Sequence, residues 1–269
     1  KAITYTLTGV NTGATVLDPV TVNDDMTQVV AFADVTTAPK AVIVKGGSET
    51  AAAAPVVTDG KLVWTGKLGI GESVKITYTV TVKAGFEGKT LHNKADSTAK
   101  PPTTPPITPP PGETEHPIPG YTFAKKSNPV SGTAVSPKGY IVYTLTGVNT
   151  GATALDVTIK DDLSKVLNHA KITEAPVATI SGGAGGTAPA VVVSGDQVSW
   201  KGTLEVGQKV EITYSVQLNE DTDTGAVVVN NQASSKAQPP GDTPPITPPE
   251  VVTEHPVPGY TFTKVSDPV

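Results

Sequence analysis

The sequence has no cysteine, a single methionine and few aromatic residues, and it contains no run of about 18 apolar residues. Without cysteine, neither disulfides nor thiolate metal sites can hold the fold together. Without a long apolar run, we expect no membrane insertion in this segment. A formal charge of −5 provides no basic face for nucleic acid or for an anionic membrane, so no nucleic-acid partner is expected.

Valine and threonine recur throughout the chain, and 26 glycines and 25 prolines are spread along its 269 residues. Branched side chains fit a pleated strand and lose rotamers in a helix, so this composition favours strands. The glycines and prolines indicate many turns and extended connections. The length is sufficient for two ordinary domains, each with its own core.

An internal repeat is the strongest pattern in the sequence. The stretch "YTLTGVNTGAT" at 5–15 returns unchanged at 143–153, and "TPPITPP" at 104–110 returns at 243–249. The short stretch "TEHP" occurs at 114–117 and again at 253–256. One unit of about 138 residues therefore occurs about twice.

Within one repeat, the pattern is that of β-strands. The stretches "YIVYTLTGVNTG" and "TALDVTIKDDL" alternate between apolar and polar residues, and "QVSWKGTLEVGQKVEITYSVQL" predicts two strands joined at "EVGQ". "GAVVVNNQASSKA" predicts the last strand, and a turn at "LSKVL" is the most helix-like stretch. The sequence thus predicts an all-β protein of tandem immunoglobulin-like β-sandwich domains. Trp64 and Trp200 occupy equivalent positions and are expected to be core aromatics.

The repeat and the prolines define the expected domain boundaries. Residues 1–100 form an immunoglobulin-like repeat that lacks its first strand, residues 101–120 a Pro-rich linker, residues 121–237 a complete repeat, residues 238–259 a second Pro-rich linker, and residues 260–269 an orphan first strand of a following repeat. Dense proline holds a chain near polyproline II, so both linkers are predicted to be semi-rigid spacers.

Strand periodicity places a few polar side chains inside the predicted core. In "YTFAKK", Lys125 shares a face with apolar neighbours, and Asp161 does the same in "VTIKDDL". Asn231 lies on the inward face of "VVVNNQAS", and the equivalent positions in the first repeat are Asp24 and Asn93. The complete repeat is thus expected to bury one Lys, one Asp and one Asn against the same core.

A buried trio of this kind has a defined chemistry. Burial lowers the pKa of a lysine and raises that of an aspartic acid, so a neutral amine can lie beside a protonated carboxyl. The amine can attack the Asn amide carbon while the carboxyl polarises the amide oxygen, and loss of ammonia leaves an isopeptide bond. The alternative is a buried Lys–Asp salt bridge with Asn hydrogen-bonded nearby. Either way we expect no metal, no cofactor and no turnover enzyme, only a crosslink that forms once.

The stretch "YTFAKKSNPVSGTAVSPKGYIVYTLTGVNTGATALDVTIKDDL", together with "NNQAS", resembles the tandem isopeptide-forming repeats of Gram-positive surface proteins and fimbrial subunits. In that family a first-strand Lys bonds to a last-strand Asn in an N-x-A context, assisted by an Asp in a D-x-L context. The resemblance implies a crosslink between Lys125 and Asn231 assisted by Asp161. In the first repeat it implies Asn93 as acceptor and Asp24 as the assisting residue, within "D-x-M" rather than "D-x-L".

Three functions are compatible with these patterns. The chain is a stalk or fibre segment of a cell-surface protein, a filament subunit that pairs with neighbouring copies, or an adhesin module for an unknown host or matrix ligand. All three imply an extracellular location, on a bacterial cell surface or in a fibre attached to the cell wall. Exposed aromatic clusters would support the adhesin hypothesis, and the stretch "GGAGGTAP" at 182–189 has no such anchors.

Lys264 lies in "PGYTFTKVSDPV", a near copy of "PGYTFAKKSNPV" at 119–130. Its expected Asp and Asn partners are absent from its own repeat. It is therefore either the donor of a following repeat, in a window cut from a longer array, or a donor to Asp24 and Asn93 of a neighbouring chain by strand addition.

Overall fold

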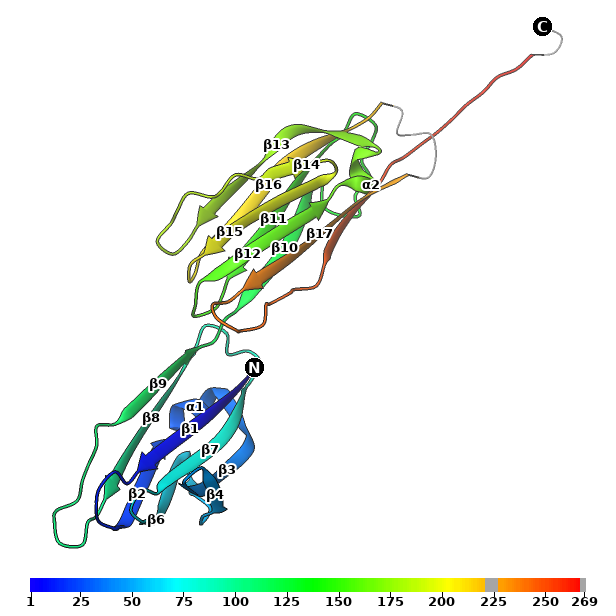
Figure 1. Cartoon of the computed structure of the whole chain (residues 1–269). Coiled ribbons are helices and arrows are strands. Elements are labelled where there is room, and N and C mark those ends of the chain that lie inside the picture. Colours follow the sequence, from blue (N-terminus) through cyan, green and yellow to red (C-terminus); the bar gives the residue numbers. More distant parts are fainter. Residues whose placement is uncertain (221–226, 267–269) are drawn as a thin grey trace. The chain divides into compact units, whose positions relative to one another are not determined.

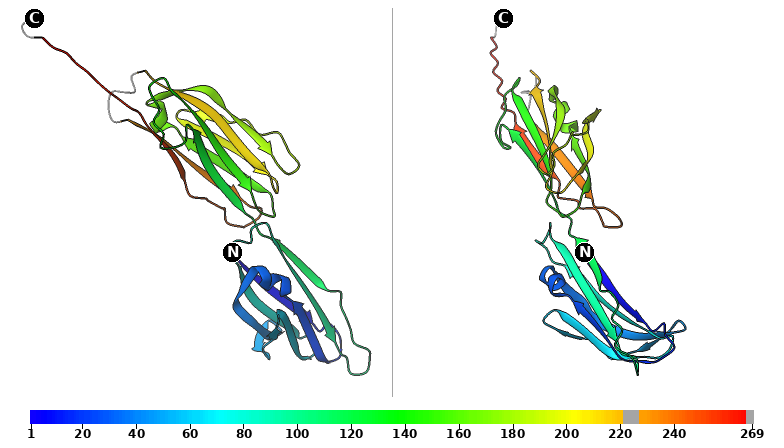
Figure 2. Two further views of the ribbon diagram at one scale, coloured as in Figure 1. Left: turned by 180° about the vertical axis from the view of Figure 1, so that it is seen from behind. Right: turned by 90° about the vertical axis from the view of Figure 1, so that its left-hand side faces the viewer.

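The computed structural model describes residues 1–220 and 227–266, and its chain divides into two compact units, Lys1–Ile118 and Pro119–Val269. Each unit is a sandwich of two antiparallel sheets (Figures 1 and 2). The predicted fold class, tandem immunoglobulin-like β-sandwiches, is confirmed.

Unit 2, the complete repeat, has one sheet of four strands and one of five. The first sheet has the order β10 (Tyr121–Asn128), β11 (Tyr140–Asn149), β16 (Lys209–Leu218), β13 (Ala170–Ser181). The second has the order β14 (Val192–Ser194), β15 (Gln197–Leu204), β12 (Leu155–Asp162), β17 (Val228–Gln238), β18 (Val251–Pro256). One short helix, α2 (Ser164–Leu167), forms at the turn expected in "LSKVL".

Unit 1 repeats this plan without a first strand. One sheet has the order β1 (Ala2–Val10), β7 (Ser73–Val82), β3 (Ala33–Lys45), β4 (Ser48–Ala51). The other has the order β5 (Val56–Thr58), β6 (Lys61–Leu68), β2 (Leu17–Asp25), β8 (Thr90–Ala99), β9 (Gly112–Pro117). The helix α1 (Thr27–Phe32) lies after β2.

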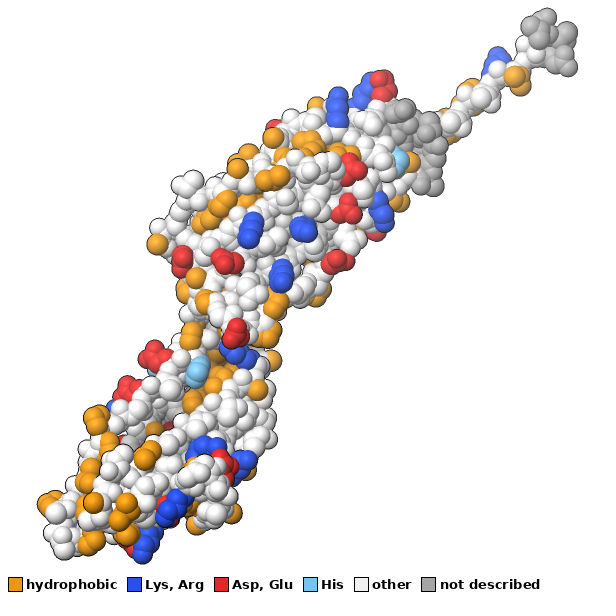
Figure 3. Space-filling view, viewed as in Figure 1, with side chains coloured by type: hydrophobic (Ala, Val, Ile, Leu, Met, Phe, Trp, Pro, Cys, Tyr) orange, Lys and Arg blue, Asp and Glu red, His pale blue; other side chains and the backbone are white. Residues whose placement is uncertain are grey.

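The cores follow the alternation of the strands. In β16 the residues at every second position, Val210, Ile212, Tyr214 and Val216, are almost fully buried. Trp200 is buried in the core of unit 2 as expected, and its indole N–H donates to the carbonyl of Pro189 at 3.1 Å. On the face seen in Figure 3, lysines and acidic residues are interspersed, and they form no basic patch.

The two regions predicted as Pro-rich spacers each contain a strand, which corrects the sequence interpretation of residues 101–120 and 238–259. β9 pairs with β8, and β18 pairs with β17, so each sheet gains a fifth strand. Alternation within "VVTEHP" explains this, because Thr253 and His255 are buried while the residues between them are exposed. Dense proline obscured this alternation.

The unit 1 sheet that begins with β1 has a free outer edge. In unit 2 the equivalent strand β11 is paired on both sides, with β10 and with β16. In unit 1, β1 pairs with β7, and no other described strand lies beside it. Residues 257–266 follow β18 as an extended segment that belongs to no strand (Figure 1).

Candidate functional site

The β10 strand carries Lys125 into the interior of unit 2. The strand alternates, so Lys125 points inward while its neighbour Lys126 is exposed. The Lys125 side chain has 0% exposure, and its Nζ lies 2.5 Å from Oδ1 of Asp161, whose side chain is also 0% exposed. The same Nζ lies 5.2 Å from the ring centroid of Tyr143.

Asp161 on β12 is connected to Asn231 on β17 through one tyrosine. The hydroxyl of Tyr214 on β16 donates to Oδ2 of Asp161 at 2.6 Å. The same hydroxyl accepts a hydrogen bond from Nδ2 of Asn231 at 2.8 Å. Four elements thus bring an amine, a carboxyl, a hydroxyl and an amide together in a space without solvent contact.

Burial dominates the electrostatics of this site. It lowers the pKa of the Lys125 amine to about 8, and the Asp161 carboxylate opposes part of that change. It also raises the pKa of Asp161, which the Lys125 ammonium and the hydrogen bonds from its neighbours oppose. Both changes favour the neutral pair of amine and carboxylic acid over the ion pair. Burial and Asp161 together raise the pKa of Tyr214 well above its usual range, so its hydroxyl remains a donor.

Asn231 is fully buried, and its Oδ1 has no hydrogen-bond partner among the described residues. An unpaired buried amide oxygen costs free energy, so it is a ready acceptor for any proton that a neighbour can supply. The arrangement can therefore support attack on the amide carbon, with the protonated Asp161 as the nearby acid.

Unit 1 contains the same site without its lysine. Asp24 and Asn93 are buried, the Tyr78 hydroxyl donates to Oδ2 of Asp24 at 2.7 Å, and Nδ2 of Asn93 donates to that hydroxyl at 2.8 Å. Oδ1 of Asp24 has no hydrogen-bond partner among the described residues, whereas the equivalent Oδ1 of Asp161 in unit 2 accepts from Lys125. Burial raises the pKa of Asp24, and no nearby ammonium opposes that change.

The predicted site residues therefore form two groups. Lys125, Asp161 and Asn231 meet in unit 2, and Asp24 and Asn93 meet in unit 1. Lys264 belongs to neither group, because it lies in the exposed segment after β18.

Sequence reasoning missed the tyrosines of the site. Tyr214 and its unit 1 equivalent Tyr78 bridge carboxyl and amide, while Tyr143 and its equivalent Tyr5 lie beside them. Both pairs are identical in the two repeats and occupy inward strand positions, which is a usable signal. An inward tyrosine is, however, equally typical of an ordinary core.

No group of three His, Asp or Glu side chains that could hold a metal ion occurs in residues 1–220 and 227–266. Within the same residues, no helix is long and apolar enough to cross a membrane.

Comparison with known proteins identifies a family. The family model described as a domain of unknown function (DUF7927) matches residues 1–118 and residues 120–257. The chain belongs to this family. Both matches include the strands β9 and β18, so the DUF7927 unit ends after the "EHP" stretch and not before the prolines. No curated protein matches the chain.

Several solved structures are similar to the chain at low identity. The C-terminal domain of the Streptococcus agalactiae AgI/II polypeptide BspA is 13% identical, over 94% of this chain and 92% of that one, with a TM-score of 0.45. BcpA, the major pilin subunit of Bacillus cereus, is 13% identical over 83% and 65%, with a TM-score of 0.40. The collagen-binding domain of a Staphylococcus aureus adhesin is 13% identical over 51% and 97%, with a TM-score of 0.34.

Proposed function

We propose that this chain is a stalk or fibre segment of a bacterial cell-surface protein, and that unit 2 is locked by an autocatalytic isopeptide bond between Lys125 and Asn231. The observation that carries the proposal is the fully buried Lys125 amine, which contacts Asp161, the carboxyl that the Tyr214 hydroxyl joins to Asn231. A lysine held this way would be a costly way to stabilise a core if it served only as a salt bridge.

The reaction needs no cofactor. In the neutral pair, the Lys125 Nζ lone pair attacks Cγ of Asn231, and Asp161 gives its proton to the amide oxygen. The new C–N bond forms, and Asp161 then carries a proton from Nζ to Nδ2. The Cγ–Nδ2 bond breaks and ammonia leaves, while the oxygen returns its proton to Asp161 and the carbonyl is restored. Atoms and charge balance, because one neutral amine and one amide become one amide and one ammonia.

The crosslink has a structural use. It joins β10, the first strand of unit 2, to β17 on the opposite sheet. Closing a loop of about 105 residues restricts the unfolded chain by about 4–5 kcal/mol if it acts as other crosslinks do. In a chain without cysteine, this provides a covalent brace that reducing conditions cannot break. Two tandem units of the same plan suit a stalk, whose role is length and toughness, and such a stalk belongs outside the cell.

The test is the intact mass of the denatured protein. We expect the monomer to be about 17 Da lighter than its sequence, because one ammonia is lost. The variants Lys125→Ala and Asn231→Ala should each have the full sequence mass. The matched control is Lys126→Ala, which changes the exposed neighbouring lysine on the same strand and should keep the deficit. A wild-type monomer at full sequence mass would exclude the bond and leave Lys125 as a buried salt-bridge partner.

A fragmentation experiment locates the bond. Digestion of the wild type should give one branched peptide that joins the Lys125 and Asn231 regions. In Asp161→Asn, which removes the acid but keeps the shape, bond formation should slow by at least a factor of about 100. Unchanged kinetics in that variant would contradict the role of Asp161.

A further inference from the structure

Unit 1 has an open groove at the place where unit 2 has the strand β10. We propose that this groove binds residues 258–266 of a second copy of the chain, which add an edge strand beside β1. The docking stands on the geometry of unit 1, whereas the covalent step described below rests on the crosslinking function proposed above.

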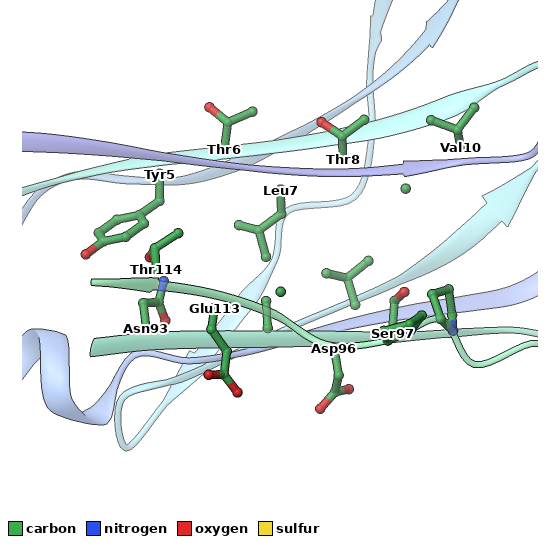
Figure 4. A pocket seen from close by; sticks show the side chains of 16 residues that line it. Tyr5, Thr6, Leu7, Thr8, Val10, Asn93, Asp96, Ser97, Glu113 and Thr114 are labelled. Atoms are coloured by element: carbon green, nitrogen blue, oxygen red, sulfur yellow. The ribbon is translucent and has the colours of Figure 1, made fainter. Parts of the chain in front are cut away.

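The groove runs between β1 on one sheet and β8 with β9 on the other, and its volume is about 440 Å³. Figure 4 shows Tyr5 and Leu7 pointing into it from β1, whereas Thr6 and Thr8 point away. The unit 2 equivalent of Leu7 is Leu145, which is fully buried under β10, whereas Leu7 is partly exposed. The groove thus has an apolar floor that a strand would cover.

The matching strand occurs a second time in the chain. Residues 258–266, "PGYTFTKVS", repeat "PGYTFAKKS" at 119–127 with two differences. In the second copy Tyr260 is 84% exposed and Phe262 is 77% exposed, whereas the equivalent Tyr121 is 7% exposed. Burying two such aromatic side chains is worth several kcal/mol, so the segment gains by finding a groove.

The register of β10 predicts where the added strand would lie. In unit 2, Lys125 lies opposite Leu145 in the antiparallel ladder between β10 and β11. The equivalent register in unit 1 places Lys264 opposite Leu7 and directs its side chain at Asp24. In unit 1, Oδ1 of Asp24 has no hydrogen-bond partner among the described residues.

A second polar contact is available deeper in the groove. The Tyr121 hydroxyl and Ser235 Oγ are hydrogen-bonded at 2.7 Å in unit 2. The unit 1 equivalent of Ser235 is Ser97, which lines the groove. We therefore expect the Tyr260 hydroxyl of the added strand to form a hydrogen bond with Ser97.

A third contact lies at the other end of the strand. In unit 2, Nδ1 of His255 donates to the Thr133 carbonyl at 3.0 Å, and its Nε2 is hydrogen-bonded to the Ser127 hydroxyl, also at 3.0 Å. The unit 1 equivalent of His255 is His116, and the equivalent of Ser127 in the free segment is Ser266. We therefore expect the Ser266 hydroxyl of the docked segment to form a hydrogen bond with His116.

The backbone of unit 1 leaves space for the same strand. A Cβ placed on Gly151 in unit 2 would lie 2.2 Å from the backbone nitrogen of Gly120, so only glycine fits beside the residues that lead into β10. The unit 1 equivalent is Gly13, where a Cβ would meet only an Asn11 side-chain oxygen at 3.5 Å. Gly13 therefore keeps open a space that unit 1 itself does not use.

A second copy is the occupant because the segment has no place in its own unit. The edge beside β11 is already filled by β10, and residues 258–266 contain no strand. Docking a strand on a free edge pairs its backbone groups with those along β1.

Docking would also allow a bond between chains. Nζ of Lys264 attacks Cγ of Asn93 in the other copy, while Asp24 carries a proton from the amine to the leaving nitrogen. One C–N bond forms, the Cγ–Nδ2 bond breaks, and one ammonia leaves for each junction.

Two full-length variants test this in trans. Asn93→Ala keeps the donor segment but has no acceptor, and Lys264→Ala keeps the acceptor groove but has no donor. We expect each variant alone to show one denatured band. After mixing, we expect a covalent heterodimer whose mass is the sum of the two chains less about 17 Da for the junction. Sedimentation in native buffer measures docking itself, and Lys264→Ala alone should still associate.

One glycine variant tests the groove, and two variants of solvent-facing residues provide controls. Gly13→Ala in the acceptor should weaken association at least about tenfold, because its Cβ fills the space for residues 258 and 259. Thr58→Ala changes an exposed residue of β5, which does not line the groove, and should leave association unchanged. Val265→Ala should also be neutral, because the equivalent Lys126 faces solvent in unit 2.

Each outcome has one meaning. If Gly13→Ala abolishes association, docking is supported. If the chains associate but no heterodimer band forms, the result counts against the bond between chains. Association that Gly13→Ala does not change, or a strictly monomeric wild type at high concentration, would overturn the proposal. So would a monomer lacking two ammonia molecules, since the segment would then fill its own chain's groove. The Lys125–Asn231 bond is judged separately, from the monomer mass of Lys264→Ala.

Discussion

Two adjacent lysines on β10 have opposite environments, and the difference explains the chemistry of the site. Lys126 faces solvent. Lys125 faces Asp161 and the ring of Tyr143, where burial favours the neutral amine. Strand alternation alone assigns these environments, so this part of the site could be predicted from the sequence.

The buried amine should make the stability of unit 2 depend on pH whenever the crosslink is absent. In Asn231→Ala, Lys125 remains a free amine, and burial should hold its pKa at about 8 in the folded state, below the 10.5 of an unburied lysine. Between these values the unfolded state binds more protons, so the free energy of unfolding should rise with pH, by up to about 3 kcal/mol. Urea unfolding at pH 7, 8, 9, 10 and 11 measures this rise.

Two further proteins isolate the effect of this amine. Asn231→Ala combined with Lys125→Met has no buried amine and should lack the rise. The crosslinked wild type should also lack it, because the amine has become an amide. An equal rise in all three proteins would show that other groups cause it.

The tyrosines of the site could not be assigned a role from the sequence. Tyr214 occupies an inward position between Ile212 and Val216, and such a position is typical of simple core packing. Only the three-dimensional arrangement shows that its hydroxyl joins Asp161 to Asn231. Long-range contacts between four strands decide such a role, and strand periodicity carries no information about them.

At the scale of elements, β18 holds β10 and the turn after it in place. His255 on β18 is fully buried, and it joins Ser127 to the carbonyl of Thr133. The backbone of Gly132 also donates to the carbonyl of Glu254 at 2.7 Å. The proline content led to a spacer prediction here, because composition averages over a window whereas pairing depends on alternate residues.

Removing this histidine should therefore destabilise unit 2 selectively. We expect His255→Ala to lower the free energy of unfolding by about 2–3 kcal/mol, because it removes a fully buried side chain and leaves the Thr133 carbonyl and the Ser127 hydroxyl without this partner. The matched change in unit 1, His116→Ala, should cost less than about 1 kcal/mol at low protein concentration, where the groove is empty.

Each unit contains one tryptophan, so fluorescence can follow the two units separately. Trp64→Phe leaves Trp200 as the reporter of unit 2, and Trp200→Phe leaves Trp64 as the reporter of unit 1. The Asn231→Ala background keeps unit 2 free of the crosslink, so its unfolding is an equilibrium measurement. Equal losses for the two histidine variants would contradict the bracing role of β18.

At the scale of the whole molecule, the crosslink determines which part of unit 2 can extend under load. Tension on the chain enters unit 2 through β10 and leaves it after β18. With the bond in place, force passes from Lys125 directly to Asn231, and the chain between them carries none. The segment from Asn231 to Val257, which includes the β17–β18 pair, remains outside the bond and can extend.

Stretching single molecules by both ends should measure this difference. The chain between Lys125 and Asn231 has about 105 residues, so its release adds about 370 Å of contour length. We expect Lys125→Ala to show this gain and the wild type to lack it, with the segment from Asn231 to Val257 of the wild type extending by only about 90 Å. Unit 1 is the internal control, because it lacks a lysine at the site and should extend equally in both proteins. Equal unit 2 extensions would mean that no bond carries the load, and β10 would then separate from β11 by rupture of hydrogen bonds alone.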